Sequence, residues 1–446
     1  MSYDLSHLLS RHLELCGYQR KDVPIIQPAD LFLTRAGDTI IERLFSFERH
    51  GRLFALRPEF TSAATRQYAL EGHSTSQRWY FSGPIFEDLS DNPFQNQRPS
   101  VGAELLNAVG TNADFEIIRA AMGGIELSQL DGWHLVIGHA ALQRHLLSKI
   151  GLDHHQYRML LNHRELLKTQ GAAAVEAKLR EQISAEISSP EAFSAEESDA
   201  STQHMLDVLL DSTQYGSTMG SRTREDIAQR ILSKRKRSHG LDLLLEGLNV
   251  FAKWTALRGK PTDIFAAIAQ LLDAGDSVGQ GYVEAWNQLV DLLEASGVPS
   301  ERIILQPNLA RNWEYYTGIV FGVEVNDVYV AAGGRYDDLA TLVNDDATAV
   351  PAVGFSYYVD RLLDLLPTPA PSSSIVVQTQ KQWISAGQEV TDFLREHDIP
   401  TRLAFDRQNT TSDKLLVTVV AENAVQYRND IFAIDQLESL LNALGS

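Results

Sequence analysis

The sequence contains a single cysteine, Cys16, among its 446 residues. A disulfide within one chain and a cysteine-based metal site are therefore both excluded, which is typical of proteins from a reducing cytoplasm. No window approaches the roughly 18 apolar residues that a membrane-spanning helix needs. The segment up to Tyr18 lacks the basic start and continuous apolar core of a signal peptide. We predict a cytoplasmic protein, and we expect neither a cofactor nor a metal ion.

Basic residues are also scarce relative to acidic ones. The chain has 39 Lys and Arg against 58 Asp and Glu, a net charge of −19. Sequence-independent binding to nucleic acid requires Lys and Arg to displace counterions from phosphates, so this balance argues against it. One concentrated basic run exists, Lys234 to Arg237. We interpret the run as a solvated helix end, with contact to an anion or phosphate as the alternative.

The distribution of patterns along the chain indicates several domains. Residues 1–137 and 301–366 carry most of the strand-like segments, whereas residues 138–300 are almost wholly helical in pattern. Within the helical part, residues 181–201 are rich in Ser, Ala and Glu, and we expect a flexible acidic stretch. A Pro- and Ser-rich linker at 367–374 precedes alternating strand and helix patterns over 375–446, which predict a small α/β domain.

The segment from Leu309 to Leu339 is central to the first predicted domain because it combines a predicted hairpin with charged and phenolic side chains. Its apolar strand pattern is followed by Asn326-Asp327, a good turn signal, and then by a second strand. The second strand ends in a Gly-Gly pair before Arg335, a pattern typical of close backbone approach. Surface polarity at the strand ends is the alternative interpretation.

A second segment, Leu56 to Thr61 with the sequence LRPEFT, joins two predicted elements. We expect strands at 43–47 and 51–56 before it. A helix from Ser62 to about Leu70 should follow it, with Thr61 as the N-cap. Glu59 and Glu104 could receive an ammonium or imidazolium group, while arginines 311, 335 and 361 could receive a carboxylate or phosphate.

Five motifs in order resemble the catalytic core of class II histidyl-tRNA synthetases. They are LRPEFT, WYFSGPIFEDL, RNWEYYTG, GGRYDDL and AVGFSYYVDRLLDLL. The resemblance covers about 1–137 and 301–366 and is weak elsewhere. It implies an α+β fold, with an antiparallel sheet flanked by helices, a helical insertion, and a C-terminal α/β domain that resembles a shortened anticodon-binding domain.

The departures from the synthetase pattern concern phosphate handling. Where the synthetases carry an arginine that contacts the carboxylate and the ATP phosphate, this chain has Glu87. An anion there would repel the charge that develops on the phosphate. The following run to Gln97 contains no basic residue, and Arg98 could replace the missing guanidinium only if the loop folds back. We therefore expect no catalytic residues and no adenylation.

The positions that would hold an amino acid are retained. By resemblance, the histidine-contacting residues are Glu59, Thr61, Glu104, Arg311, Tyr315 and Tyr316. Arg361 matches an arginine that contacts the ATP γ-phosphate in synthetases. With Arg335 it is a candidate for an anion or ATP-like pocket.

This combination resembles the regulatory subunits of ATP phosphoribosyltransferase, paralogues of the synthetases in histidine biosynthesis. The string from Tyr315 to Phe321, YYTGIVF, is closer to that family than to the synthetases. The resemblance implies a short-form catalytic subunit as partner, histidine as allosteric effector, and self-dimerisation through about 24–32. The alternatives are a divergent histidyl-tRNA synthetase and a stand-alone histidine-sensing protein.

Overall fold

The computed structural model describes residues 2–33, 38–89, 95–188, 224–309, 315–343, 348–367, 374–405 and 416–444. The chain divides into two compact units, Met1–Leu366 and Pro367–Ser446, each with its own hydrophobic core. No helix in the described part of the chain is both long and apolar enough to cross a membrane.

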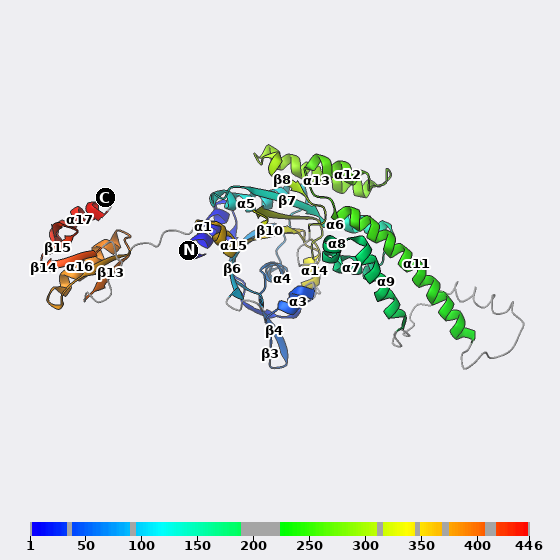
Figure 1. The fold of residues 1–446 in the computed structure, drawn as a ribbon, viewed down its shortest axis with the longest axis horizontal. Coiled ribbons are helices and arrows are strands. Elements are labelled where there is room, and N and C mark those ends of the chain that lie inside the picture. The colour runs from blue at the N-terminus through cyan, green and yellow to red at the C-terminus, as the bar shows by residue number, and fades with distance from the viewer. Residues whose placement is uncertain are drawn as a thin grey trace, which may run out of the picture. The chain divides into compact units, whose positions relative to one another are not determined.

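An eight-stranded sheet forms the centre of the first unit (Figure 1). Its strand order is β1-β5-β6-β11-β10-β9-β7-β8. The pairs from β5 to β7 are antiparallel, and the two edge pairs, β1 with β5 and β7 with β8, are parallel. The strands are β1 (Gln19–Arg20), β5 (Gln77–Phe86), β6 (Gln97–Leu106), β7 (Trp133–His139), β8 (Ile303–Leu305), β9 (Ile319–Val325), β10 (Val328–Arg335) and β11 (Ala352–Tyr358).

Helices cover both faces of this sheet because successive strand residues point to opposite sides and both sides are apolar. One face packs against α1 (Ser2–Leu15), α5 (Gly110–Leu127) and α15 (Val359–Leu365), with α13 (Ser277–Ala295) over α5. The opposite face, which we call the pocket face, lies under α4 (Thr61–Glu71), and α2 (Asp30–Leu33) and α14 (Leu339–Val343) pack against that helix. The site described below lies on the pocket face.

The predicted central hairpin is confirmed. Strands β9 and β10 pair as neighbours, and their turn is Asn326-Asp327, with φ of 50° and 63°. Left-handed backbone at both turn residues matches the right-handed twist of the strands, and Asn and Asp tolerate it better than most side chains.

The region before α4 differs in detail from the expectation. Helix α3 (Asp38–Arg43) ends where a strand was predicted to begin. A small sheet of order β2-β4-β3 follows, built from β2 (Ile26–Pro28), β3 (Ser46–Arg49) and β4 (Arg52–Leu56). Thr61 is the first helical residue of α4 and not its N-cap, which is Phe60 without a side-chain cap bond. The Thr61 hydroxyl has a different partner, described below.

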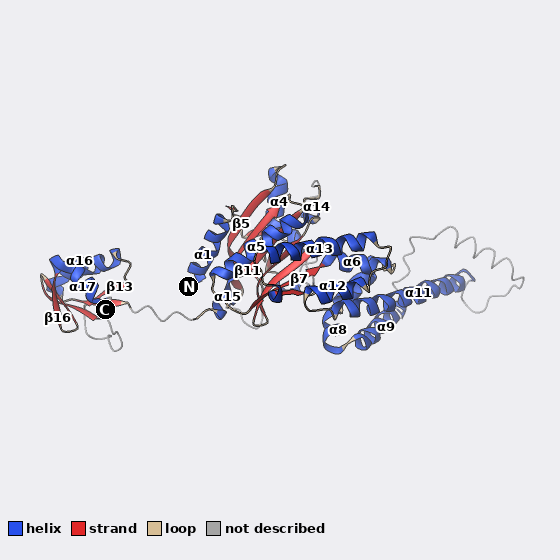
Figure 2. Cartoon of the chain, turned by 90° about the horizontal axis from the view of Figure 1, so that it is seen from above, coloured by secondary structure: helices blue, strands red, loops and turns tan. Residues whose placement is uncertain are grey.

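Helices make up the described part of the insertion (Figure 2). They are α6 (Ala140–Lys149), α7 (His154–Asn162), α8 (Arg164–Gln170), α9 (Ala172–Ser188), α11 (Arg224–Thr255), α12 (Pro261–Ala269) and α13 (Ser277–Ala295). Leucines from α6 to α9 pack with Leu244, Leu248 and Phe251 of α11 into a separate small core. Residues 181–188 of the stretch expected to be flexible are helical and end α9. The remainder of that stretch lies outside the described residues.

The second unit is a small α/β domain with strand order β13-β12-β14-β15-β16. The strands are β12 (Ile375–Gln378), β13 (Thr401–Ala404), β14 (Leu416–Ala421), β15 (Ala424–Tyr427) and β16 (Asp430–Ala433). Helices α16 (Ile384–Glu396) and α17 (Leu437–Leu444) complete it. The sequence interpretation missed β15, because four residues between turn-forming Asn and Asp carry too little periodic signal.

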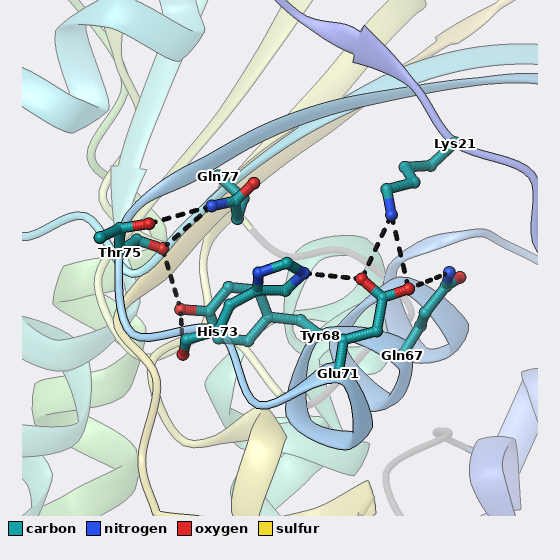
Figure 3. A network of polar contacts seen from close by, with 7 residues as sticks. All are labelled: Lys21, Gln67, Tyr68, Glu71, His73, Thr75 and Gln77. Atoms are coloured by element: carbon teal, nitrogen blue, oxygen red, sulfur yellow. Dashed lines mark hydrogen bonds and ion pairs between the residues drawn. The ribbon is translucent and has the colours of Figure 1, made fainter.

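A polar network fixes the end of α4 beside the sheet (Figure 3). The Glu71 carboxylate accepts hydrogen bonds from Gln67 and Lys21 and contacts the His73 ring nitrogen at 2.6 Å. These contacts, with that from Gln67 foremost, lower the Glu71 pKa to about 2. The His73 ring packs against Trp79, and Lys21 lies over the same indole. The network therefore anchors the helix that begins with the predicted site residue Thr61.

His139 gives this fold a specific dependence on pH. Its side chain caps α6 by accepting from the Leu142 amide, and its ring contacts Tyr282 and Trp286. Burial lowers the His139 pKa to about 3, so the native state holds the neutral ring. The stabilisation of the folded state by the neutral His139 ring is complete above the ordinary histidine pKa, and it is lost as the pH falls toward 3. When the pH is lowered from 7 to 5, we expect the free energy of unfolding to fall by about 2 kcal/mol because of His139.

Urea unfolding followed by tryptophan fluorescence measures this effect. Five of the six tryptophans belong to the first unit, so the signal reports mainly on it. His139→Asn is the matched variant, because asparagine is a good N-cap that does not titrate. Its stability should depend less steeply on pH than that of the wild type, and equal slopes would refute the assignment to His139.

Candidate functional site

Glu104 is the centre of the site on the pocket face. It lies on β6 and is 1% exposed. The Thr61 hydroxyl at the start of α4 donates to one carboxylate oxygen at 2.6 Å, and the Tyr336 hydroxyl donates to the other. The structure thus brings together residues from three chain-distant motifs, and it explains why Thr61 does not cap its own helix.

Glycines on the neighbouring strands make space for this arrangement. Gly354 on β11 is the register partner of Glu104, and Gly334 on β10 is the partner of Gly354. A Cβ atom on Gly354 would lie 1.5 Å from the Glu104 Oε2 atom, and one on Gly334 would lie 2.8 Å from the Tyr316 ring. The close approach expected at the Gly-Gly pair is therefore the packing of the Tyr316 ring against the backbone of Gly334.

Three tyrosines form one wall of the site. Tyr315, Tyr316 and Tyr336 are 5%, 7% and 1% exposed. The Tyr315 ring centre lies 4.9 Å from that of Tyr316 and 5.7 Å from that of Tyr336. Burial foremost, then the adjacent Glu104 charge, raises the Tyr336 pKa, so this phenol remains a hydrogen-bond donor.

Glu59 supplies a second carboxylate beside the same wall. Its two oxygens accept from the Ser62 amide at 3.0 and 3.2 Å, at the positive end of α4. Burial raises the Glu59 pKa, partly offset by these hydrogen bonds, and its charge adds to that of Glu104 in raising the Tyr336 pKa. The buried carboxylate of Glu104 and the half-buried one of Glu59, beside aromatic rings, favour a ligand with N–H donors or a positive charge, such as an ammonium or imidazolium group.

The opposite end of strands β5 and β6, around Glu87, is occupied by ion pairs. Glu87 is bound by Arg43 at 3.0 Å and by Arg98 at 3.4 Å. Arg98 also forms a two-point contact with Asp360, at 2.8 and 3.3 Å. Arg98 is thus neutralised by two carboxylates and does not supply an unpaired guanidinium for a phosphate.

The two arginines expected to form an anion pocket do not share one. Arg335 is 7% exposed and pairs with Asp114 of α5 and with Asp337. Arg361 donates to the Tyr329 carbonyl at 3.0 Å. Residues 329 and 335 lie at the two ends of β10, about 20 Å apart. Arg335 is a structural ion-pair residue, because its partner Asp114 is buried with it.

The remaining expected contact, Arg311, lies outside the described residues. The sequence interpretation missed Tyr336 as a site residue, although its motif GGRYDDL was singled out. The available signal was its position directly after the Gly-Gly-Arg string. Its hydrogen bond to Glu104 joins residues 232 positions apart, which no local pattern reveals.

Comparisons with known proteins agree with this fold and motif order. The family model described as histidyl-tRNA synthetase matches residues 3–222 and 217–362. The ATP phosphoribosyltransferase regulatory subunit of Allorhizobium ampelinum is 30% identical over 364 residues, 78% of this chain and 93% of that protein. The subunit of the same name from Brucella ovis is 26% identical over 350 residues, covering 76% and 91%.

Solved structures show the same architecture. A protein from Bacillus halodurans, titled an ATP phosphoribosyltransferase regulatory subunit/histidyl-tRNA synthetase, has a TM-score of 0.63 at 16% identity and covers 94% of each chain. The histidyl-tRNA synthetase from Nostoc has a TM-score of 0.65 at 15% identity, covering 99% of this chain and 95% of its own. At these identities the likeness concerns the fold alone.

The antiparallel sheet with its helical layers defines a class II synthetase-like protein, as the sequence predicted. Within this class, the family is shown by the extent of the family-model match and by the 30% identity across most of a relative. The chain belongs to the histidyl-tRNA synthetase family, in the branch whose curated members are the ATP phosphoribosyltransferase regulatory subunits.

Proposed function

We propose that this chain is the non-catalytic regulatory subunit of an ATP phosphoribosyltransferase. It would be required for activity of a short catalytic subunit and would convey feedback by histidine in the first step of histidine biosynthesis. The curated relatives of this name support the proposal, since the chain spans more than nine-tenths of their length.

The observation that carries the proposal is the contrast between the two ends of the site. Thr61, Glu104 and Tyr336 form a preorganised acceptor site. At the other end, Glu87 stands where the synthetases carry an arginine, and it is bound by two arginines. Catalysis of adenylation requires positive charge directed at the phosphate, whereas binding of an amino acid does not.

We assign histidine to the Glu104 site. Its imidazole and ammonium groups match the two carboxylates, Glu104 and Glu59, and its ring suits the tyrosine wall of Tyr315 and Tyr316. Arg311 is the proposed partner of the histidine carboxylate, because a guanidinium binds a carboxylate through two parallel hydrogen bonds.

Regulation then requires two quaternary states that differ in histidine affinity, since a ligand shifts an equilibrium only by its differential binding. We propose a hetero-oligomer with the catalytic subunit, in which this chain also self-associates through about 24–32. The test is reconstitution. The short catalytic subunit from the same host should condense ATP with phosphoribosyl pyrophosphate only when this chain is added, and histidine should then inhibit it.

The main rival is an active histidyl-tRNA synthetase. Histidine-dependent exchange of pyrophosphate into ATP by the purified chain would establish that rival and refute our proposal. Histidine binding without recovery of a phosphoribosyltransferase from the host would instead favour a stand-alone sensor. Measuring both activities on one preparation distinguishes the three functions.

Glu87→Arg alone should not restore adenylation. The new guanidinium would remove one charge repulsion, but residues 88–97 supply no further basic group and Arg98 would remain bound to Asp360. We expect pyrophosphate exchange to stay at the background of a no-enzyme control. Exchange that rises with histidine concentration would show that one charge, and not the whole loop, separates this chain from a synthetase.

A further inference from the structure

The hairpin β3–β4 extends away from the body of the first unit (Figure 1). All four residues of β3 are exposed. On β4, Ala55 is fully buried against the body, and β2 pairs only with residues 54–56. The half of the hairpin nearer its turn is therefore two-stranded, an arrangement that is marginally stable without further contacts.

The outward side of this half has an unusual composition. We define the hairpin face as Phe47, Arg49, Arg52 and Phe54, which point to one side because side chains alternate along a strand. Phe47 and Phe54 are register partners with stacked rings 6.1 Å apart, and Phe47 is 36% exposed. Phe54 is half-buried. A stacked aromatic pair that exposes one ring on a projecting element is typical of a binding surface.

The charges on the hairpin face are also uncompensated. Arg49 and Arg52 are directly opposite in register, and like charges in this position repel. Within the described residues, neither guanidinium has a carboxylate partner, although Arg52 lies 5.4 Å from the Phe54 ring centre. Elsewhere in this unit, exposed arginines such as Arg11 and Arg180 pair with a glutamate one turn away.

We propose that the hairpin face docks onto the catalytic subunit, at a surface that offers an apolar recess beside carboxylate groups. The recess would bury the Phe47–Phe54 pair, and the carboxylates would bind the two arginines through paired hydrogen bonds. This inference rests on the proposed function and names the surface through which that function is exerted.

Two other occupants fit the face less well. A second copy contacting the same face would leave the arginines unpaired, since the face carries no carboxylate. Nucleic acid would pair with Arg49 and Arg52, but the chain carries a net charge of −19, which repels phosphates at longer range. An acidic, partly apolar protein surface would match both the aromatic pair and the two arginines of the hairpin face.

The test measures binding of the full chain to the purified short catalytic subunit by calorimetry. Arg49→Glu/Arg52→Glu and Phe47→Ser/Phe54→Ser should each raise the dissociation constant at least about thirtyfold. The matched charge control is Lys260→Glu/Lys381→Glu, two exposed lysines on other elements. Val109→Ser is the apolar control, since Val109 is 73% exposed. Both controls should bind like the wild type, and histidine affinity should confirm that each variant is folded.

The outcomes separate the inference from the proposed function. If the wild type binds and the hairpin variants bind equally well, the docking surface lies elsewhere and the inference is refuted while the function stands. If the wild type does not bind the catalytic subunit, both the inference and the proposed function are refuted. Loss of self-association by the variants in sedimentation would assign the face to a second copy. If the wild type binds bulk tRNA and Arg49→Glu/Arg52→Glu does not, the hairpin face is a nucleic-acid surface. Either result would overturn the proposal.

Discussion

Glu104→Gln is expected to weaken histidine binding about a hundredfold, a loss of roughly 2.7 kcal/mol. Glutamine keeps the shape of the side chain but removes the charge and one acceptor position. The Thr61 and Tyr336 hydroxyls that now donate to the carboxylate would compete for the remaining oxygen. Histidine would then face an amide N–H where it needs an acceptor. Isothermal titration calorimetry with histidine, with and without ATP, measures the change.

The matched control is Glu324→Gln. Glu324 is also a buried glutamate of the central sheet, 7% exposed, but it pairs with Arg258 at 2.9 Å. This variant should lose some stability and keep its histidine affinity. If Glu104→Gln also binds histidine like the wild type, the effector site lies elsewhere, for example at the interface with the catalytic subunit.

The order of the central elements follows from local sequence patterns. The turn at Asn326-Asp327 predicted its hairpin, because two residues that tolerate left-handed backbone leave few other conformations for a strand pair. Glu59, Thr61 and Glu104 were named from the family resemblance, and the structure brings the Thr61 hydroxyl to the Glu104 carboxylate.

The partners of charged and hydroxyl groups could not be predicted in this way. Arg335 is bound by Asp114, which lies 221 residues earlier in the sequence. Thr61 has a good N-cap composition, yet its hydroxyl binds Glu104, since burying that carboxylate without a donor would cost more than an empty cap. The choice between a ligand site and an internal ion pair depends on such long-range contacts.

Local propensity also failed where tertiary pairing decides the structure. The composition of residues 181–188 gave no sign of a helix end, whereas α9 continues through them to Ser188 from Val175 and Leu179, which pack in the core of the insertion. Strand β15 is only four residues long and is held by partners on both sides, β14 and β16. In both cases the stabilising contacts lie outside any sequence window.

Gly354→Ala should weaken both the stability of the chain and its binding of histidine. Its Cβ atom would lie 1.5 Å from Oε2 and 2.4 Å from Cδ of Glu104, and 2.9 Å from the Ala103 carbonyl oxygen. The carboxylate must then leave the Thr61 and Tyr336 hydroxyls. We expect the free energy of unfolding to fall by about 3 kcal/mol and histidine binding to be lost. Urea unfolding and calorimetry measure the two effects.

Two further variants identify the cause of this loss. Gly281→Ala, on the exposed side of α13 with no atom within 4 Å of the new methyl group, should gain up to about 1 kcal/mol and bind histidine normally. In Gly354→Ala/Glu104→Ala the shortened side chain makes room for the methyl group, so stability should partly return while binding stays lost. If the double variant is no more stable than Gly354→Ala, the clash is with the Ala103 backbone. The glycine would then be required by the strand pairing and not by the carboxylate.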